Sequence, residues 1–392
     1  MYDFDQVHDR RNTGSLKWDV AENELPLWVA DMDFACPPAV AQAIAERAEQ
    51  GIFGYSVVPD AWYEAYMGWW EARHGVRYER DWLAFCAGVV PAISSAVRCL
   101  TNPGDKVVLQ TPVYNAFFNC IEDNGRRVLE NPLAYRDGAY EMDLADLEAK
   151  LADPRAALLI LCNPHNPVGK IWDVETLARV GELCEKHGVV VVSDEIHCDI
   201  TAPGVKYVPF ISAGEACARN SVTCVAPTKT FNIAGLQTSA IVVPNARLRE
   251  RVMRALSNDK VAEPNFFACA AAQAAFEHGA EWLDELREYV FANREFAGAF
   301  LRERVPEVRL VEAQATYLLW VDCSAVVANA REFVSFMRER TGLMVCPGEA
   351  YGKPGAGFVR INVACPRCTL EDAMNRFACA VAQWKEQEKA GA

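Results

Sequence analysis

Short, unbroken apolar runs recur through the middle of the chain, and polar residues follow each of them. The runs at 157–161, 189–192 and 222–225 are too short for ordinary helices and contain many branched side chains. Such runs are typical of strands that are buried on both faces of a sheet. Helices and strands then alternate through about Val192, which predicts an α/β fold with a mainly parallel sheet and helices on both faces.

The N-terminal part of the chain has a different pattern. Residues 1–26 are polar and rich in turn-forming residues, which predicts an arm and not a domain. Pro37 and Pro38 predict the start of a helix that Gly51 ends. A second helix is expected over 60–74, with Asp60 as its N-cap and an aromatic load that is more typical of core or dimer packing than of a ligand site.

The C-terminal part is expected to form a second, smaller unit. A helical pattern over 280–304 is long enough to bridge two domains, and the strands and helices beyond it alternate without flexible linkers. We therefore expect three segments: an arm that joins the small domain (1–48), a large domain (49–287) and a small α+β domain (288–392).

Composition excludes several classes of partner. Of the 392 residues, 51% are hydrophobic, and the net charge of −14 disfavours nucleic acid and anionic membranes as partners. Apolar runs fall well short of the roughly 20 residues of a membrane span, and the first residues lack the apolar core of a signal peptide, so we expect a cytoplasmic protein. The 15 cysteines suit small buried side chains in a reducing cell. Cys365 and Cys368 have no second pair at zinc-site spacing, and we expect no metal.

Three strand ends carry groups that suit one chemistry. Lys229 follows the run 222–225 after Pro227 and Thr228, while Asp194 and Asn166 follow the two preceding runs. Ligands of open α/β sheets lie at the carboxyl ends of strands, so the three side chains are expected to face one crevice. A desolvated lysine can form a Schiff base with an aldehyde, an acid can keep a pyridine nitrogen protonated, and an amide can donate to a ring oxygen. These groups suit pyridoxal 5′-phosphate (PLP).

The sequence motifs resemble a known family. Asn-Pro-His-Asn-Pro-Val-Gly (163–169), Ser-Asp-Glu-Ile-His (193–197) and Ala-Pro-Thr-Lys-Thr-Phe-Asn-Ile-Ala-Gly-Leu (226–236) resemble fold-type I PLP enzymes of the aminotransferase superfamily, most of all cystathionine β-lyases of the MalY/PatB kind. The resemblance extends from about Leu25 to about Pro366. It implies a large domain with a mainly parallel seven-stranded sheet and a smaller α+β domain.

The resemblance also implies roles for cofactor-binding residues. Tyr114 would stack on the pyridine ring, although alone it could equally be a core tyrosine. Pro91 fits the first position of a helix whose free backbone amides suit phosphate, and the family uses the amides of Val89 and Val90 there. Further cofactor contacts implied are Thr228 and His197 within the chain and Tyr55 from the other subunit of a homodimer with composite sites.

The substrate end is implied in the same way. Arg360 interrupts a β-branched strand, where it could form a buried ion pair or clamp the α-carboxylate of an amino acid, and the family places such an arginine here. Ala30 and Asp31 belong to an Ala-Asp-Met-Asp-Phe segment that lines the amino-acid end of the site in the lyases, and Tyr55 would border the substrate as well.

Three functions remain open from the sequence. In the first, Lys229 removes the Cα proton of a thioether amino acid such as cystathionine, Tyr114 protonates the departing sulfur, and thiol, pyruvate and ammonia result. The second is an aminotransferase on the same scaffold; His197 in place of a tyrosine, Gln237 in place of a phosphate-binding arginine and Ala226 in place of a serine argue against it. The third is a lyase scaffold with an additional regulatory binding role.

Overall fold

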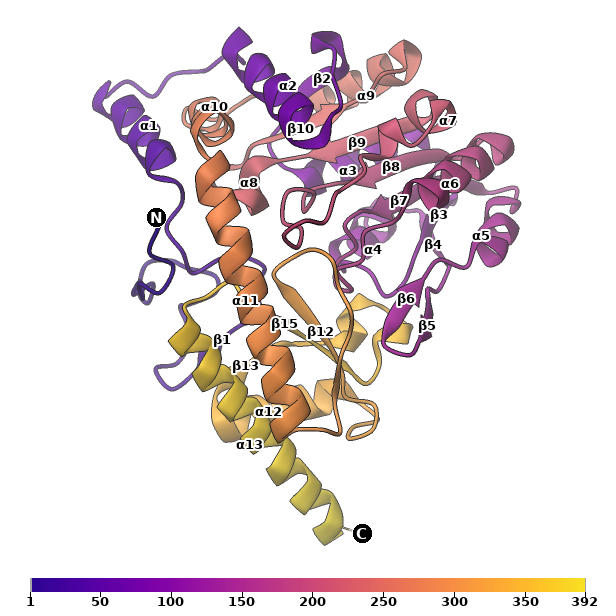
Figure 1. Cartoon of the computed structure of the whole chain (residues 1–392). Coiled ribbons are helices and arrows are strands. Elements are labelled where there is room, and N and C mark those ends of the chain that lie inside the picture. The colour runs from indigo at the N-terminus through magenta and orange to yellow at the C-terminus, as the bar shows by residue number, and fades with distance from the viewer. Residues whose placement is uncertain (1, 392) are drawn as a thin grey trace.

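The computed structural model describes residues 2–391. A seven-stranded sheet forms the core of the upper part of the molecule in Figure 1. Its strand order is β2-β10-β9-β8-β7-β3-β4. Neighbouring strands are parallel except where β10 pairs antiparallel with β2 and β9. The strands are β2 (Leu83–Cys86), β3 (Lys106–Leu109), β4 (Arg127–Glu130), β7 (Ala156–Cys162), β8 (Val190–Asp194), β9 (Ser221–Val225) and β10 (Ser239–Val242). The α/β architecture with a mainly parallel sheet is thereby confirmed.

The apolar runs of these strands are continuous because helices cover both faces of the sheet. In β7, Leu158 and Ile160 pack on one face, and Leu159 and Leu161 pack on the other, as expected for the two-residue period of a strand. The first face is covered by α3 (Val89–Leu100), α4 (Ala116–Glu122) and α9 (Ala246–Asn258), and the second by α5 (Leu144–Leu151), α6 (Val174–His187) and α7 (Glu215–Arg219).

A smaller antiparallel sheet lies below the first, with strand order β11-β12-β15-β14. The long helix α11 runs from beside α10 down to this sheet (Figure 1). There α13 packs against α11 and α12, and α12 packs against β14 and β15. The elements are α11 (Ala280–Arg304), β11 (Arg309–Leu310), β12 (Leu318–Asp322), α12 (Ala330–Thr341), β14 (Cys346–Pro347), β15 (Phe358–Asn362) and α13 (Arg367–Gly391). The domain limits stay a prediction, and the limit at 287 falls inside α11.

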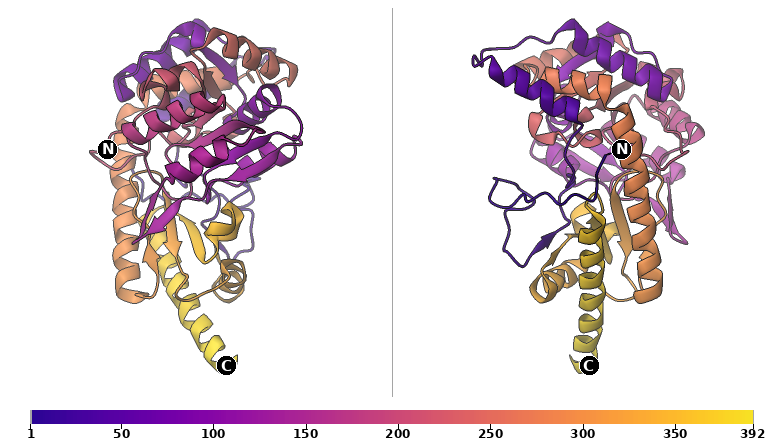
Figure 2. Two further views of the ribbon diagram at one scale, coloured as in Figure 1. Left: turned by 90° about the vertical axis from the view of Figure 1, so that its right-hand side faces the viewer. Right: turned by 60° about the vertical axis from the view of Figure 1, so that its left-hand side comes forward.

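The N-terminal arm joins the smaller sheet region (Figure 2) through β1 (Leu25–Pro26), which pairs in parallel with β13 (Leu343–Met344). The chain then enters α1 (Pro38–Glu49) and α2 (Asp60–His74), and both pack against α10 (Ala268–His278). The aromatic side chains of α2 are buried in the core, as in the contact of Tyr66 with Phe276.

Three details of the predictions are wrong. Pro59 is the N-cap of α2 and Asp60 is its first residue. Helix α3 begins at Val89 after Gly88, so Pro91 is its third residue and not its first. The predicted alternation of helix and strand also missed a hairpin of β5 (Ala134–Arg136) and β6 (Ala139–Glu141), whose strands are too short to produce a clear periodic signal.

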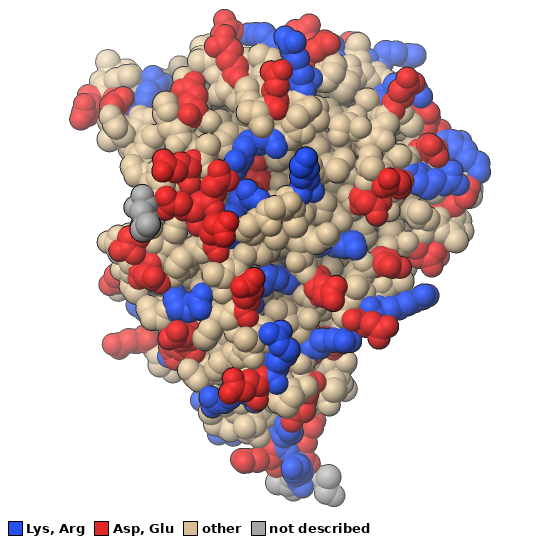
Figure 3. Space-filling view, in the orientation of Figure 1, with Lys and Arg blue, Asp and Glu red and all other residues tan. Residues whose placement is uncertain are grey.

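Acidic and basic side chains are interspersed over the face shown in Figure 3. That face carries no broad basic area of the kind a polyanion would require. Within residues 2–391, no helix is both long enough and apolar enough to cross a bilayer.

Candidate active site

A cavity of about 230 Å³ lies at the carboxyl ends of β7, β8 and β9. Parallel strands deliver their carboxyl ends to one edge of a sheet, which is why residues far apart in sequence meet there. Most of the predicted site residues form its wall: Ala30, Val89, Val90, Tyr114, Asn166, Asp194, His197, Thr228 and Lys229.

Lys229 enters this cavity from a single helical turn. Strand β9 ends at Val225, and Pro227 opens the four-residue helix α8 (Pro227–Thr230). The Nζ atom donates to the carbonyl oxygen of Ala30 at 2.5 Å. Burial, with a contribution from the charge of Arg360, lowers the pKa of Lys229 from 10.5 to about 8. A substantial share of this amine is therefore neutral near pH 8.

Asp194 ends β8 and is a buried residue of the cavity wall. Its Oδ1 accepts the backbone N–H of Ile196 at 3.0 Å. Burial raises the pKa of Asp194 to about 7 despite that hydrogen bond and the charge of Lys229. When this carboxylate is charged, burial makes the charge costly, so a protonated nitrogen is a favourable partner for it.

Arg360 reaches the site from the other sheet. Its position on β15 brings Nη1 to 3.2 Å from Asn166 Oδ1, and Nη2 donates to the carbonyl oxygen of Trp28 at 2.8 Å. The Nε atom is buried without a hydrogen-bond partner among residues 2–391. Arg360 thus contacts Asn166, which is part of the cavity wall, and a buried guanidinium with a free N–H is suited to a carboxylate.

The remaining cofactor candidates are neutral groups. His197 is buried, its Nδ1 has no partner within the described chain, and burial lowers its pKa to about 3, so the ring is neutral. Burial raises the pKa of Tyr114, which keeps its phenol protonated. The amides of Val89 and Val90 precede the first hydrogen bond of α3, donated by Ala92 N–H to Gly88 O, and such amides form an anion site.

Residues 27–34, here called the strap, contribute Ala30 to the cavity wall. The carbonyl oxygen of Ala30 accepts a second hydrogen bond, from Tyr317 Oη at 3.0 Å. Asn362 Nδ2 donates to the carbonyl oxygens of Val29 at 2.7 Å and of Asp31 at 2.6 Å. The sequence pattern did not single out Tyr317 or Asn362, although Asn362 lies two residues after Arg360 and the strand period places both on one face.

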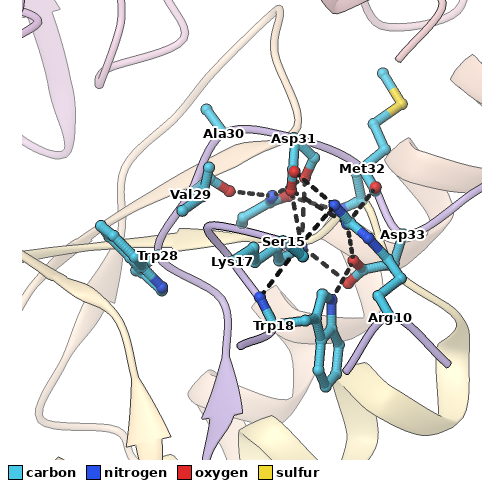
Figure 4. Close-up of polar contacts among 12 residues, drawn as sticks. Arg10, Ser15, Lys17, Trp18, Trp28, Val29, Ala30, Asp31, Met32 and Asp33 are labelled. Carbon is cyan, nitrogen blue, oxygen red and sulfur yellow. Dashed lines mark hydrogen bonds and ion pairs between the residues drawn. The ribbon is translucent and has the colours of Figure 1, made fainter. Parts of the chain in front are cut away.

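Asp31 does not line the main cavity, although the resemblance placed it at the substrate end. Figure 4 shows its carboxylate turned toward Arg10 and Lys17, and it lines a neighbouring cavity that shares Ala234 with the first. Tyr55 lies outside both cavities, with its side chain fully exposed on this chain. Gln237, which stands where relatives carry an arginine, does line the main cavity.

A buried carboxylate that the sequence did not reveal supports the lysine segment. Asp199 accepts hydrogen bonds from Trp69 Nε1 at 3.0 Å, from Thr230 Oγ1 at 2.8 Å, and lies 2.8 Å from His74 Nε2. These contacts hold the residue after Lys229 against α2. His74, Cys198 and Asp199 also have metal-ligating atoms within 4.8 Å of one another, but Arg73, Lys206 and Arg287 line the adjoining cavity and disfavour a cation.

Comparisons with known proteins agree with this geometry. Residues 22–377 match the family model described as aminotransferase class I and II. The chain belongs to this family. It is 44% identical to cystathionine beta-lyase PatB of Bacillus subtilis, over 96% of this chain and 99% of that protein. It is 32% identical to protein MalY of Escherichia coli, over 95% and 96% of the two chains.

A solved structure extends the family likeness to three dimensions. Cystalysin from Treponema denticola, which contains a PLP cofactor, superimposes with a TM-score of 0.93 at 32% identity, over 98% of this chain and 99% of that one. The predicted resemblance to the MalY/PatB group of this aminotransferase family is therefore confirmed.

Proposed function

We propose that this chain is a PLP-dependent carbon–sulfur β-lyase that cleaves thioether amino acids such as L-cystathionine. The observation that carries the proposal is the convergence of Lys229, Asp194 and Asn166 on one cavity, with Arg360 hydrogen-bonded to Asn166. The likeness to PatB supports the reaction type. The overall reaction adds water to the thioether amino acid and yields thiol, pyruvate and ammonium.

The residues present fit PLP. Asp194 supplies a buried carboxylate for a pyridinium N–H, the start of α3 and Thr228 supply donors for a phosphate, and Tyr114 supplies an aromatic face. Lys229 is the one lysine in the cavity wall formed by described residues, and it would hold the aldehyde carbon. When bound, PLP supplies an electron-withdrawing ring that stabilises negative charge at the substrate Cα.

Lys229 would move the proton at Cα. With a pKa of about 8, its amine is neutral often enough to accept a proton near neutral pH and acidic enough as an ammonium to return one. The hydrogen bond to Ala30 O aims the Nζ atom at the strap side of the cavity. The family resemblance places Ala30 at the amino-acid end of the site, so the amine would face a bound amino acid there.

Arg360 and Tyr114 would act on the substrate itself. The free Nε–H and the Nη groups of Arg360 offer a planar pair of donors for the α-carboxylate, which lysine could not reproduce. Tyr114 keeps its phenol proton because burial raises its pKa, so it can protonate the departing sulfur. Both contacts would orient the Cβ–S bond for cleavage.

A second copy of this chain would complete the site. Exposed apolar side chains gather on the extended segment between α1 and α2, with Ile52 78% exposed and Val57 83% exposed. Contiguous exposed apolar residues of this kind mark an interface. Tyr55 lies at the centre of this segment, and in a homodimer it would donate to the partner's cofactor phosphate and border the substrate there.

One assay separates lyase from aminotransferase. Purified protein with PLP is given L-cystathionine without any keto acid, and pyruvate and free thiol are measured. We expect both to accumulate in equal amounts. Turnover that requires a keto acid and releases no thiol would overturn the lyase assignment in favour of transamination.

A further inference from the structure

Arg360 is held by groups that carry no negative charge. The residue is 4% exposed, and its hydrogen-bond acceptors are the amide oxygen of Asn166, the carbonyl oxygen of Trp28 and the sulfur of Cys346. Within residues 2–391, no carboxylate forms an ion pair with it. A buried cation usually has an anionic partner, because its removal from water is costly. The charge of Arg360 therefore stays available for an anionic ligand.

Cys346 reaches Arg360 from the neighbouring strand. The register of β14 with β15 places the two residues opposite each other, and opposite residues of an antiparallel pair project their side chains to the same face. The Sγ atom of Cys346 accepts from Arg360 Nη2 at 3.7 Å and donates to the carbonyl oxygen of Trp28 at 3.2 Å. Arg360 Nη2 donates to that same carbonyl oxygen. The thiol therefore joins the guanidinium to the strap.

Tyr351 lies against the face of the guanidinium. The Cζ atom of Arg360 is 5.1 Å from the centre of the Tyr351 ring, within the roughly 6 Å over which an aromatic face attracts a cation. Tyr351 is 2% exposed, and its ring packs edge-to-face with Trp320 at 5.5 Å between ring centres. Burial of the pair strengthens the attraction, because water no longer screens it.

The turn that carries Tyr351 is fixed on both sides. A Cβ atom at Gly348 would lie 2.0 Å from the carbonyl oxygen of Gly355, so the lack of a side chain lets the backbone pack directly at this point. The carbonyl oxygen of Tyr351 accepts the N–H of Val113 at 2.9 Å, and Val113 precedes Tyr114. Tyr351 thereby links the arginine to the loop that carries the proposed proton donor.

We propose that Cys346 and Tyr351 are positioning residues that hold Arg360 in place without neutralising its charge. The hydrogen bonds orient the guanidinium within its plane, and the aromatic ring limits its movement out of that plane. Neither group competes for the cation with the α-carboxylate of an amino acid, as a carboxylate partner would. The inference rests on the proposed lyase function, in which Arg360 binds that α-carboxylate.

The test measures how variants bind ligands with and without an α-carboxylate. PLP-loaded protein is titrated with L-alanine, which has no leaving group at Cβ, and with ethylamine, which lacks the carboxylate. The change in the visible absorption of PLP gives each Kd. Tyr351→Leu should raise the ratio of the alanine Kd to the ethylamine Kd about tenfold. Tyr351→Phe should keep the wild-type ratio, because it retains the aromatic face.

An added charge at position 346 gives a sharper comparison. Cys346→Asp places an anion beside the guanidinium, whereas Cys346→Asn has nearly the same shape without the charge. The ratio of the alanine Kd to the ethylamine Kd should be about tenfold higher in Cys346→Asp than in Cys346→Asn. With L-cystathionine as substrate, Cys346→Asp should raise KM more than it lowers kcat.

Phe336→Leu is the matched control, because the ring of Phe336 lies 5.5 Å from the Cζ atom of Arg340 and neither residue lines the main cavity. It should keep the wild-type ratio. Equal weakening of both ligands in Tyr351→Leu, with equal ratios in the two Cys346 variants, would overturn the positioning roles. If the variants show the expected ratios but the wild type releases no pyruvate from thioethers, the lyase proposal falls and the positioning roles stand.

Discussion

The Nζ atom of Lys229 lies 2.5 Å from the carbonyl oxygen of Ala30, although 199 positions separate the two residues in the chain. The same carbonyl oxygen accepts the hydroxyl of Tyr317. The strap therefore shields the amine from part of the solvent and fixes its direction. Both effects follow from the tertiary position of a backbone atom, and both bear on the chemistry proposed for the lysine.

Lys229→Ala is expected to abolish pyruvate release from cystathionine and to remove the visible absorption band of lysine-bound PLP, because the wall formed by described residues contains no second lysine. Borohydride treatment of the wild-type protein followed by peptide mapping should place the pyridoxyl label on Lys229. A label on any other lysine would contradict the assignment.

The Asp194→Asn variant is expected to lose much of its turnover rate but to keep most of its bound PLP. An amide cannot balance the charge of a pyridinium, while the donors at α3 and Thr228 are untouched, so kcat should fall by about 10²-fold or more. PLP content, measured by absorbance after dialysis, should stay close to that of the wild type. Turnover near the wild-type rate would mean that Asp194 does not face the ring nitrogen.

The stability of the cofactor-free protein should depend on pH through Lys229. Unfolded lysine keeps its proton up to pH 10.5, and the folded residue keeps it only up to about pH 8. Between these values the unfolded state binds more protons, so Lys229 contributes an unfolding free energy that rises with pH, by on the order of 3 kcal/mol over the window.

Urea unfolding of wild type and Lys229→Met at pH 7.5 and at pH 10 measures this contribution, since other groups that titrate in this range cancel in the difference. Between pH 7.5 and pH 10, the unfolding free energy of the wild type should rise relative to that of Lys229→Met. Lys353→Met, at an exposed position, should follow the wild type. A Lys229→Met curve parallel to wild type would show that the amine titrates normally in the fold.

Composite sites predict a specific complementation pattern. Tyr55→Phe should weaken PLP retention about tenfold, because a hydrogen bond to a charged phosphate is lost. When inactive Lys229→Ala and inactive Tyr55→Asp subunits are mixed, one site of each heterodimer should carry both lesions and the other none. Part of the activity should then return, and no recovery in verified heterodimers would argue that Tyr55 does not serve the partner's site.

The sequence by itself determined the sheet and the strand ends. The runs of β7, β8 and β9 are apolar throughout because both faces are buried, so their positions are visible in one dimension. Parallel strands bring their carboxyl ends to one edge, and for that reason the convergence of Lys229, Asp194 and Asn166 could be predicted before any contact was known. The predicted alternation of helices and strands did not include β5 and β6, because strands of three residues each produce no clear periodic signal.

Only the tertiary structure decided what surrounds these groups. Ala30, Tyr317 and Asp199 act through contacts between segments far apart in sequence, and a backbone carbonyl or a buried carboxylate leaves no periodic signal. The separation of Asp31 from the main cavity likewise follows from the Arg10 and Lys17 side chains that draw its carboxylate away. Burial and fixed charges set the pKa of Lys229 and the polarity of the neighbouring cavity that Asp31 lines. Burial and charge placement depend on which atoms replace water around a group, so they are properties of the packed molecule.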